Sequence, residues 1–144
     1  MIGILTSVLA IIVLSVLPSA AQDSAADVDA VKRVVESTAA LVNDEKLEEV
    51  LALYADDARI DSRIAKAVIS KAQYRELLTQ IFARGNLNRA DVGNLKVTIV
   101  DGTHAVTDGI VYIHTKSGQR LNAKNQWKLE KRDGRWLIVE TKYQ

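Results

Sequence analysis

The chain of 144 residues has no cysteine and only one proline. Without cysteine there can be no disulfide scaffold, thiolate metal site or thiol nucleophile. Aromatic residues make up only 5% of the chain, and no sign of charge dominates, because the net charge is +1 at pH 7. A near-zero net charge gives no long-range attraction to a polyanion, so we expect no nucleic-acid partner. With 48% hydrophobic and 26% charged residues, the composition is that of an ordinary soluble globular domain.

Long hydrophobic runs are absent except at the N-terminus. The run 2–17 contains no charged residue, and it is shorter than the ~20 residues that cross a bilayer as a helix. Pro18 and three small residues follow it, a pattern that predicts cleavage by a signal peptidase before Gln22. We therefore expect residues 1–21 to be a signal peptide that contacts the membrane only before cleavage, and residues 22–144 to form one periplasmic or secreted domain. No Lys or Arg precedes the run, so an uncleaved anchor remains the alternative.

Three segments of the mature chain show helical periodicity. The first has an apolar stripe from Val28 to Val42, and the second has one from Leu47 to Tyr54, with Asn43 or Asp44 as its expected cap. The third is expected over 70–85. Its first residue, a serine, and the glutamine three positions later have the spacing of a capping box, and its last residue is a glycine.

From residue 94 the period changes to two, which indicates β-strands. We expect strands over 94–100, 103–115, 120–131 and 135–143, because an Asp-Gly or Ser-Gly pair lies in each gap, and a short strand over 58–61. Three helices followed by an antiparallel meander predict an α+β domain. In such a domain a strongly curved sheet packs one face under the helices and leaves a cone-shaped cavity.

Two motifs connect this order of elements with a known superfamily. Tyr-Ala-Asp-Asp-Ala at 54–58 follows the second helix, and Asp-Gly-Arg-Trp-Leu-Ile at 133–138 opens the last strand. With these motifs the mature chain resembles the nuclear transport factor 2-like superfamily, and more narrowly its SnoaL-like and ketosteroid-isomerase-like exported bacterial members. The resemblance implies a cone-shaped, cystatin-like roll over residues 22–144. It implies no particular reaction, because this fold carries many activities.

The resemblance to ketosteroid isomerase can be tested at three catalytic positions. Ser62 stands where that enzyme has its general-base aspartate, Thr38 where it has the tyrosine of the oxyanion hole, and Asn125 where it has a protonated aspartate. Asp61 is one residue from the base position, so strand alternation directs it to the opposite face. All three positions depart from the enzyme, but they remain polar and able to hold a ligand.

The resemblance also implies which strand residues face the cavity. It places inward Asp108, Ile110, Tyr112 and His114, then Asn125, Trp127 and Leu129, and finally Leu137, Val139, Thr141 and Tyr143. The expected ligand-binding residues are therefore Thr38, Ser62, Tyr112, His114, Asn125, Trp127 and Tyr143. By the same parity Trp136 and Ile138 lie on the outer sheet face, where they need a cover, so we expect a homodimer through that face.

Histidines and carboxylates supply the candidates for chemistry. His114 or Asp108 could act as a general base, but six strand residues separate them, about 20 Å, so they cannot form one dyad. His104 and His114 are the only histidines, and about 33 Å of strand lies between them, so we expect no metal site and no cofactor.

Charge is divided along the chain. Residues 22–61 hold 11 acidic and 4 basic side chains, whereas residues 62–144 hold 7 acidic and 15 basic ones. We interpret the basic excess as a solvated sheet face. Three hypotheses follow: a domain that binds a small, mostly apolar organic ligand; an isomerase, hydratase or hydrolase using His114 or Asp108 with Asn125, Tyr112 or Thr38 as donors; and a dimeric protein-interaction module with a filled cone.

Overall fold

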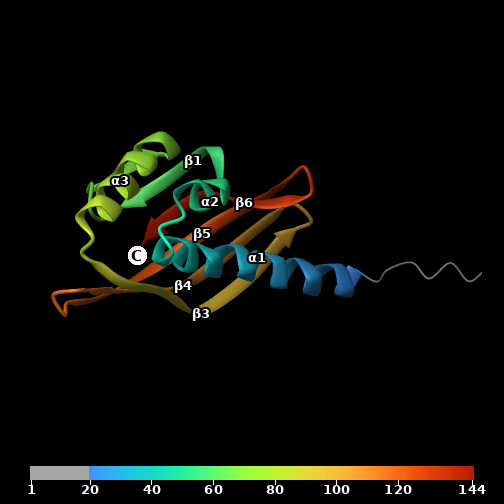
Figure 1. Ribbon diagram of the computed structural model, residues 1–144. Helices are drawn as coiled ribbons and strands as arrows, with labels where there is room; N and C mark the ends of the chain where they lie inside the picture. Colours follow the sequence, from blue (N-terminus) through green and yellow to red (C-terminus); the bar gives the residue numbers. More distant parts are fainter. Residues whose placement is uncertain (1–19) are drawn as a thin grey trace, which may run out of the picture.

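A computed structural model describes residues 20–144, with side chains from Ser24 onward (Figure 1). Residues 1–19, which hold most of the predicted signal peptide, lie outside the described residues, so that prediction remains untested. Among the described residues, no helix has both the length and the apolar composition needed to cross a membrane. The elements in chain order are α1 (Ala20–Asn43), α2 (Leu47–Ala52), β1 (Tyr54–Ser62), β2 (Ala67–Ser70), α3 (Lys71–Arg84), β3 (Leu87–Asp101), β4 (His104–Thr115), β5 (Arg120–Arg132) and β6 (Arg135–Tyr143).

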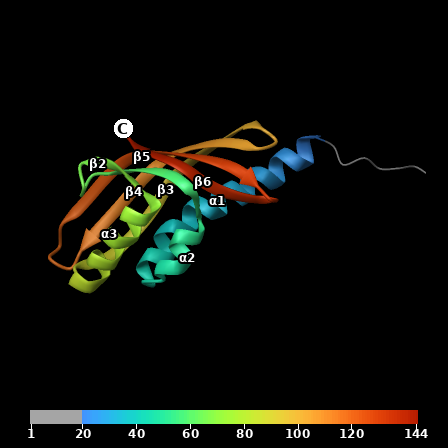
Figure 2. The same cartoon turned by 90° about the horizontal axis from the view of Figure 1, so that it is seen from above.

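The strands form a six-stranded sheet in the order β2-β1-β6-β5-β4-β3. Strands β1 and β6 pair in parallel, and the other neighbours are antiparallel. All three helices lie on one side of the sheet, which curves around them (Figure 2). The expected α+β class and the four C-terminal strands are confirmed, although β3 begins at Leu87, seven residues before its expected start. The short edge strand β2 was not predicted. We call the concave space between the sheet and the helices the cone.

The ends of α3 follow the sequence prediction. Ser70 caps the helix, its Oγ accepting from Gln73 N at 3.2 Å while Gln73 Oε1 accepts from Ser70 N at 2.9 Å. This reciprocal pair is the predicted capping box. The helix ends at Gly85, whose φ of 60° is left-handed and therefore favours a residue without a Cβ.

Asn43 does not cap α2, contrary to one of the expectations. Lys46 occupies that position, and it provides no side-chain hydrogen bond to the helix. Asn43 instead bonds the buried Ala90 of β3 twice: its Nδ2 donates to Ala90 O at 2.7 Å, and its Oδ1 accepts from Ala90 N at 2.6 Å. This pair fixes the end of α1 against the start of β3.

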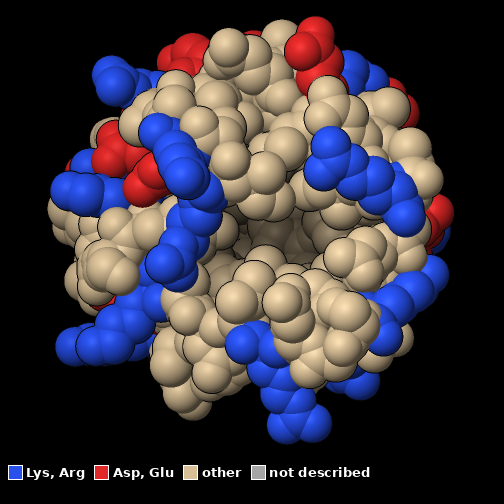
Figure 3. All heavy atoms as spheres, turned by 90° about the vertical axis from the view of Figure 1, so that its left-hand side faces the viewer, with Lys and Arg blue, Asp and Glu red and all other residues tan. Residues whose placement is uncertain are grey.

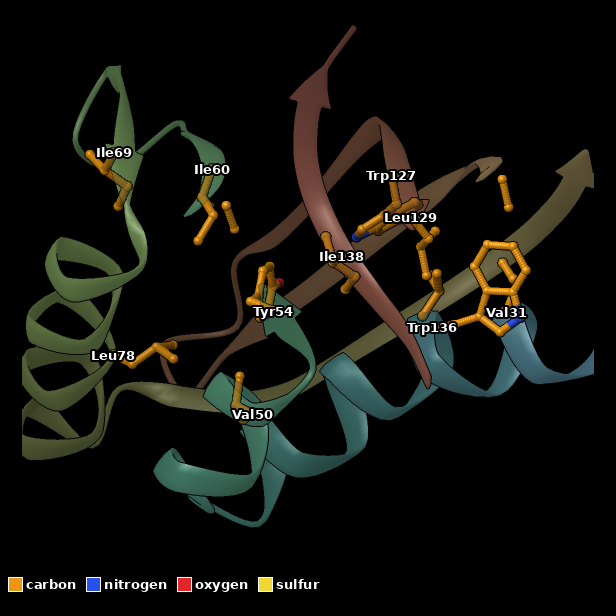
Figure 4. Packing of buried hydrophobic residues seen from close by; sticks show 13 residues of the cluster. Val31, Val50, Tyr54, Ile60, Ile69, Leu78, Trp127, Leu129, Trp136 and Ile138 are labelled. Atoms are coloured by element: carbon orange, nitrogen blue, oxygen red, sulfur yellow. The ribbon is translucent and has the colours of Figure 1, made fainter. Parts of the chain in front are cut away.

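The hydrophobic core lies where α1 and α2 cross the sheet (Figure 4). Val31 and Val35 of α1 and Val50 of α2 are fully buried, and so is Ile138 of β6. Burial of each such side chain contributes about 1.5–3 kcal/mol relative to its exposure to water. The core therefore closes the cone at the end where α1 begins.

A bulge in β6 corrects the predicted orientation of its first half. Ile138 pairs with Leu129, but Glu140 pairs with Lys128, so Val139 is an extra residue on β6. A bulged residue reverses the alternation of side chains between the two faces. Trp136 and Ile138 consequently point inward and are buried, at 6% and 0% exposure. Their expected place on an exposed outer face is wrong, and so is the inward placement of Leu137 and Val139.

Trp136 is held inside the core by a polar group. Its Nε1 donates to Asp27 of α1 at 3.0 Å, and Lys131 Nζ lies 2.9 Å from the same carboxylate oxygen. The hydrogen bonds from Lys131 and Trp136 lower the pKa of Asp27 below its usual value. Lys131 also lies over the indole ring, 5.6 Å from its centroid. The N-terminal half of α1 is thereby connected to the β5–β6 hairpin.

Candidate functional site

The strand register defines which side chains face the cone. In antiparallel pairs, residues directly opposite each other project to the same face. Trp127 and Asn125 of β5 are buried, and their partners on β4 are Thr107 and Gly109, respectively. Their partners on β6 lie beyond the bulge and are Thr141 and Tyr143.

The predicted inward placement of Asn125, Trp127, Leu129, Thr141 and Tyr143 is therefore confirmed. Ser62, two residues beyond the Ile60–Thr141 pair of β1 and β6, is also buried. The neighbouring Asp61 points away, as strand alternation predicts, and its carboxylate accepts from Tyr143 N at 3.1 Å.

Strand β4 has the opposite parity from the one expected. Four candidate residues of β4 pair with residues of β5 that alternate with its inward residues. These four are Asp108, Ile110, Tyr112 and His114, and their partners are Gln126, Lys124, Asn122 and Arg120. They lie on the outer face, so their predicted inward placement is wrong. Both faces of this strand carry apolar residues, and the pattern could not distinguish them.

The two candidate bases consequently lie outside the cone. His114 stands between Arg89 of β3 and Arg120 of β5 on the outer face. The Asp108 carboxylate accepts from Gln126 Nε2 at 2.9 Å. Neither side chain can act as a base on a ligand inside the cone, because the sheet separates them from it.

Two polar atoms inside the cone lack a hydrogen-bond partner among the described residues. They are Thr107 Oγ1 and Asn125 Oδ1, on side chains that are 0% and 5% exposed. Thr107 pairs with Trp127, two residues beyond Asn125, so the two polar side chains are diagonal neighbours. An unpaired buried polar atom costs about 1–3 kcal/mol, so such an atom needs an explanation. Both atoms are covered by neighbouring side chains, so a polar group can reach them only if these side chains shift.

Trp127 lies against β4 because Gly109 leaves room for it. A Cβ on Gly109 would stand 3.3 Å from Trp127 Cζ3 and only 2.6 Å from Leu95 Cδ2. No larger residue fits without displacing these neighbours. The indole of Trp127 can therefore pack over Gly109, where it forms one wall of the cone beside Asn125.

Other hydroxyl groups in the cone already have partners. Thr38 Oγ1 donates to Val35 O at 2.7 Å. Ser62 Oγ accepts from Ala65 N at 3.1 Å, and Thr141 Oγ1 accepts from Asp61 N at 3.2 Å. The hydroxyl protons of Ser62 and Thr141 remain available to a ligand.

Three of the four tyrosines of the chain gather on the same side of the sheet. The rings of Tyr54 and Tyr74 meet edge to face, with centroids 5.3 Å apart. Burial raises the pKa of Tyr74 to about 12, although its hydrogen bond with Tyr54 acts in the opposite direction. Burial likewise raises the pKa of Tyr54 well above its usual value, and the charge on Tyr143 contributes to the rise in both. Burial also raises the pKa of Tyr143, although Arg63 counteracts it. At neutral pH these phenols are protonated and serve as hydrogen-bond donors, not as bases.

One end of the cone is open. At the closed end the inward residues Ala105 and Leu129 are each 1% exposed, whereas Ile113 is only half-buried and its partner Leu121 is 56% exposed. The view onto this end shows a hollow at the centre of the molecule (Figure 3). A cone completely filled by side chains does not fit this view. The half-buried Tyr74 and Phe82 of α3 lie on the helical side of the same space.

No metal site forms among the described residues, because no group of three or more His, Asp or Glu side chains converges there. His104 bonds the Asp101 carboxylate, with Nδ1 and Oδ1 3.0 Å apart, in the β3–β4 turn. Two grooves of about 370 and 250 Å³ lie outside the cone, beside β2 and between α1 and β6. The acids of the first, Asp56 and Asp57, are already paired with Lys71 and Arg132.

A helix-covered, curved sheet that encloses a cone is the cystatin-like architecture of NTF2-like proteins. A structure described as an NTF2-like protein with a cystatin-like fold, from Novosphingobium aromaticivorans, matches with a TM-score of 0.71 and 14% identity over 88% of this chain and 90% of that one. The family model of the SnoaL-like domain matches residues 23–142. The chain therefore belongs to the SnoaL-like family, as its two motifs indicated.

Two further structures show the same fold. A protein from the same bacterium, proposed to be a scytalone dehydratase, has a TM-score of 0.72 and 14% identity over 86% of this chain and 87% of that chain. The protein Rv3472 of Mycobacterium tuberculosis, of unknown function and solved as a point variant, has a TM-score of 0.73 and 19% identity over 88% of this chain and 75% of that one. No curated protein matches the chain.

Sequence reasoning missed part of the site. Thr107 was not considered, because the parity chosen for β4 turned it outward. Tyr54 and Tyr74 were not among the expected ligand-binding residues. The three tyrosines lie on β1, α3 and β6, and no local pattern could have shown that such distant positions converge.

Proposed function

We propose that this SnoaL-like domain binds a compact, mostly apolar organic ligand inside the cone. The observation that carries the proposal is the hollow at the open end of the cone, below which Thr107 Oγ1 and Asn125 Oδ1 lie buried beside Trp127 without a hydrogen-bond partner among the described residues. Such a pocket, apolar with a few convergent polar groups, is typical of small-molecule sites. To bond the pair, a ligand with an N–H or O–H donor must displace the side chains that bury these atoms, and its apolar body then lies against the indole.

Binding is favoured over proton transfer by the groups available inside. The described side chains around Asn125 include phenols and hydroxyls, and Asp27, a carboxylate on the concave side, lies at the closed end bonded to Lys131 and Trp136. A general base needs a group that is unprotonated at the working pH and within reach of the ligand. The similarity to a proposed scytalone dehydratase concerns the fold alone, so it does not transfer dehydration to this chain.

Substitution of Ala123 by tryptophan should abolish binding of a neutral aromatic probe such as 2-naphthamide. Ala123 pairs with Val111 on the inner face between Asn125 and the open end, so an indole there would fill the passage. NMR titration can follow binding through the side-chain amide of Asn125 and the indole N–H of Trp127.

The matched control is Lys124→Trp, one residue further on β5 and exposed on the outer face. It should leave the shifts caused by 2-naphthamide intact. Binding that persists unchanged in Ala123→Trp, or signals of Asn125 and Trp127 that do not move in the parent protein, would refute a ligand site in the cone.

We also propose that the protein is exported, cleaved before Gln22 and dimeric. The apolar run 2–17 supports export, and the outer-face residues Ile110 and Tyr112 offer an apolar surface for a dimer in place of the buried Trp136 and Ile138. Native mass spectrometry of the protein recovered from the periplasm should give a dimer of chains that begin at Gln22. A chain retaining Met1 would contradict cleavage, and a monomer at micromolar concentration would contradict the dimer.

A further inference from the structure

Basic side chains surround the open end of the cone. Four segments meet at this end, and we call them the mouth: the β1–β2 turn (63–66), the end of α3 (82–86), the β4–β5 hairpin (115–121) and the C-terminal residues 142–144 (Figures 1 and 2). They carry no acidic side chain and six basic ones, Arg63, Lys66, Arg84, Lys116, Arg120 and Lys142. Figure 3 shows Lys and Arg side chains on several sides of the hollow.

Two contacts fix parts of this ring in place. The Arg63 guanidinium lies over the ring of Tyr143, with Cζ 5.6 Å from its centroid, and Tyr143 belongs to the inner face of the sheet. Lys116 N donates to Asn86 O at 2.9 Å, which joins the hairpin to the end of α3. Its Nζ reaches to 3.8 Å from the place where a Cβ on Gly85 would stand. Both cations are therefore held at the edge of the hollow.

None of the six basic residues of the mouth has an acidic partner within ion-pair distance in the described part of the chain. Among the residues whose side chains are described, eight Lys or Arg form ion pairs within 4.0 Å, and none of the eight belongs to the mouth. Arg120 and Lys142 pair with His114 and Gln126 and so belong to the outer face of the sheet. The other four cations, Arg63, Lys66, Arg84 and Lys116, repel one another and produce a positive potential at the opening. An anion bound there would relieve this repulsion.

The shape of the mouth favours one small anion over an extended one. The cations encircle a hollow whose wall includes the apolar residues Ile113 and Leu121, whereas a nucleic-acid or membrane surface would need a convex or flat basic face. A ligand that matches both the apolar wall and the cations has an apolar body inside the cone and a negatively charged end at the edge of the hollow. A carboxylate suits this end because guanidinium and ammonium groups bind it with charge-assisted hydrogen bonds.

We propose that the cone selects organic acids: the apolar body of the ligand enters the cone, and its carboxylate remains at the mouth among Arg63, Arg84 and Lys116. This inference rests on the proposed binding function and adds the chemical class of the ligand. It assigns a role to basic residues that the sequence pattern alone indicated to be solvated.

The test compares two probes of equal shape, 2-naphthoate and the neutral 2-naphthamide. At pH 7 the carboxyl group is ionised, so the pair differs mainly in charge. The parent protein should bind the acid about tenfold more tightly than the amide, and this preference should decrease as salt is raised, because salt screens exposed charges. Isothermal titration calorimetry gives both affinities.

A triple variant, Arg63→Gln, Arg84→Gln and Lys116→Gln, should remove the preference for the acid and leave the affinity for the amide unchanged. The control, Arg33→Gln, Arg59→Gln and Lys96→Gln, removes the same net charge from exposed positions outside the mouth and without ion pairs. It should keep the preference. Circular dichroism shows whether both variants fold.

Each outcome separates the two proposals. Equal affinities of the parent for the acid and the amide would overturn the selection of organic acids while the binding function stands. A preference that persists in the mouth variant, or that disappears equally in the control, would overturn the role of these three cations. If the parent bound neither probe, the binding function would fail, and this inference would fail with it.

Discussion

Trp136→Ala is expected to lower the free energy of unfolding by about 3–5 kcal/mol, the range for truncating a buried aromatic side chain. Trp136 is 6% exposed, and its removal would leave a cavity beside α1. It would also deprive the Asp27 carboxylate of the indole N–H that donates to it at 3.0 Å. Urea denaturation followed by circular dichroism measures the loss.

Leu137→Ala serves as the control for this prediction. Leu137 follows Trp136 on the same strand, but it faces outward and is only partly buried. Its truncation should cost about 1 kcal/mol. If Trp136→Ala retained the stability of the parent and instead changed the mass of the particle in solution, the tryptophan would belong to an intermolecular interface and the inward orientation would be wrong.

Alkaline pH should unfold the protein through its buried tyrosines. A folded-state pKa above the unfolded value means that the native state favours the protonated phenol. This contribution is therefore fully present below the unfolded pKa of 10 and is lost as pH rises toward the folded pKa. For Tyr74, whose folded pKa is about 12, the loss amounts to about 2–3 kcal/mol by pH 12. Burial of Tyr54 acts in the same direction.

The double variant Tyr54→Phe and Tyr74→Phe tests this prediction. It lacks both phenols, so its stability should decrease less steeply than that of the parent above pH 10. The tyrosinate absorbance that the parent shows in excess of the double variant should appear together with unfolding, since Tyr54 and Tyr74 resist ionisation while the fold persists. Parallel stability curves of the two proteins in alkali, or excess tyrosinate formed while the parent is fully folded, would contradict the burial of these hydroxyls.

Local signals predicted the elements well. The capping box of Ser70 and Gln73 and the stop at Gly85 were readable because each depends on neighbouring residues only. The Asp-Gly turn at 133–134 was readable for the same reason, since both residues adopt positive φ, 50° and 75°, as a tight hairpin requires. The helical stripe of α1 predicted its buried face, including Val31 and Val35.

The faces of the strands were harder to predict. Assignment of a strand to one face needs a polar side, and β4 has apolar residues on both, with Val111 inward and Ile110 and Tyr112 outward. In β6 the extra residue Val139 reverses the parity midway, and nothing in its sequence marks the bulge. The orientation of β4 affected the candidate site. His114 and Asp108, which were expected in the cone, lie on the outer face, and Thr107, which was not expected there, lies in the cone.

The Asn43–Ala90 contact has a consequence for association between molecules. Strand β3 is an outermost strand of the sheet, so some of its backbone groups face away from β4 and could pair with a strand of another molecule. The Asn43 amide donates to Ala90 O and accepts from Ala90 N, which are the two bonds that an incoming strand would form there. One side chain thus occupies the place of a neighbouring strand, and growth of the sheet by edge-to-edge pairing is blocked at this point.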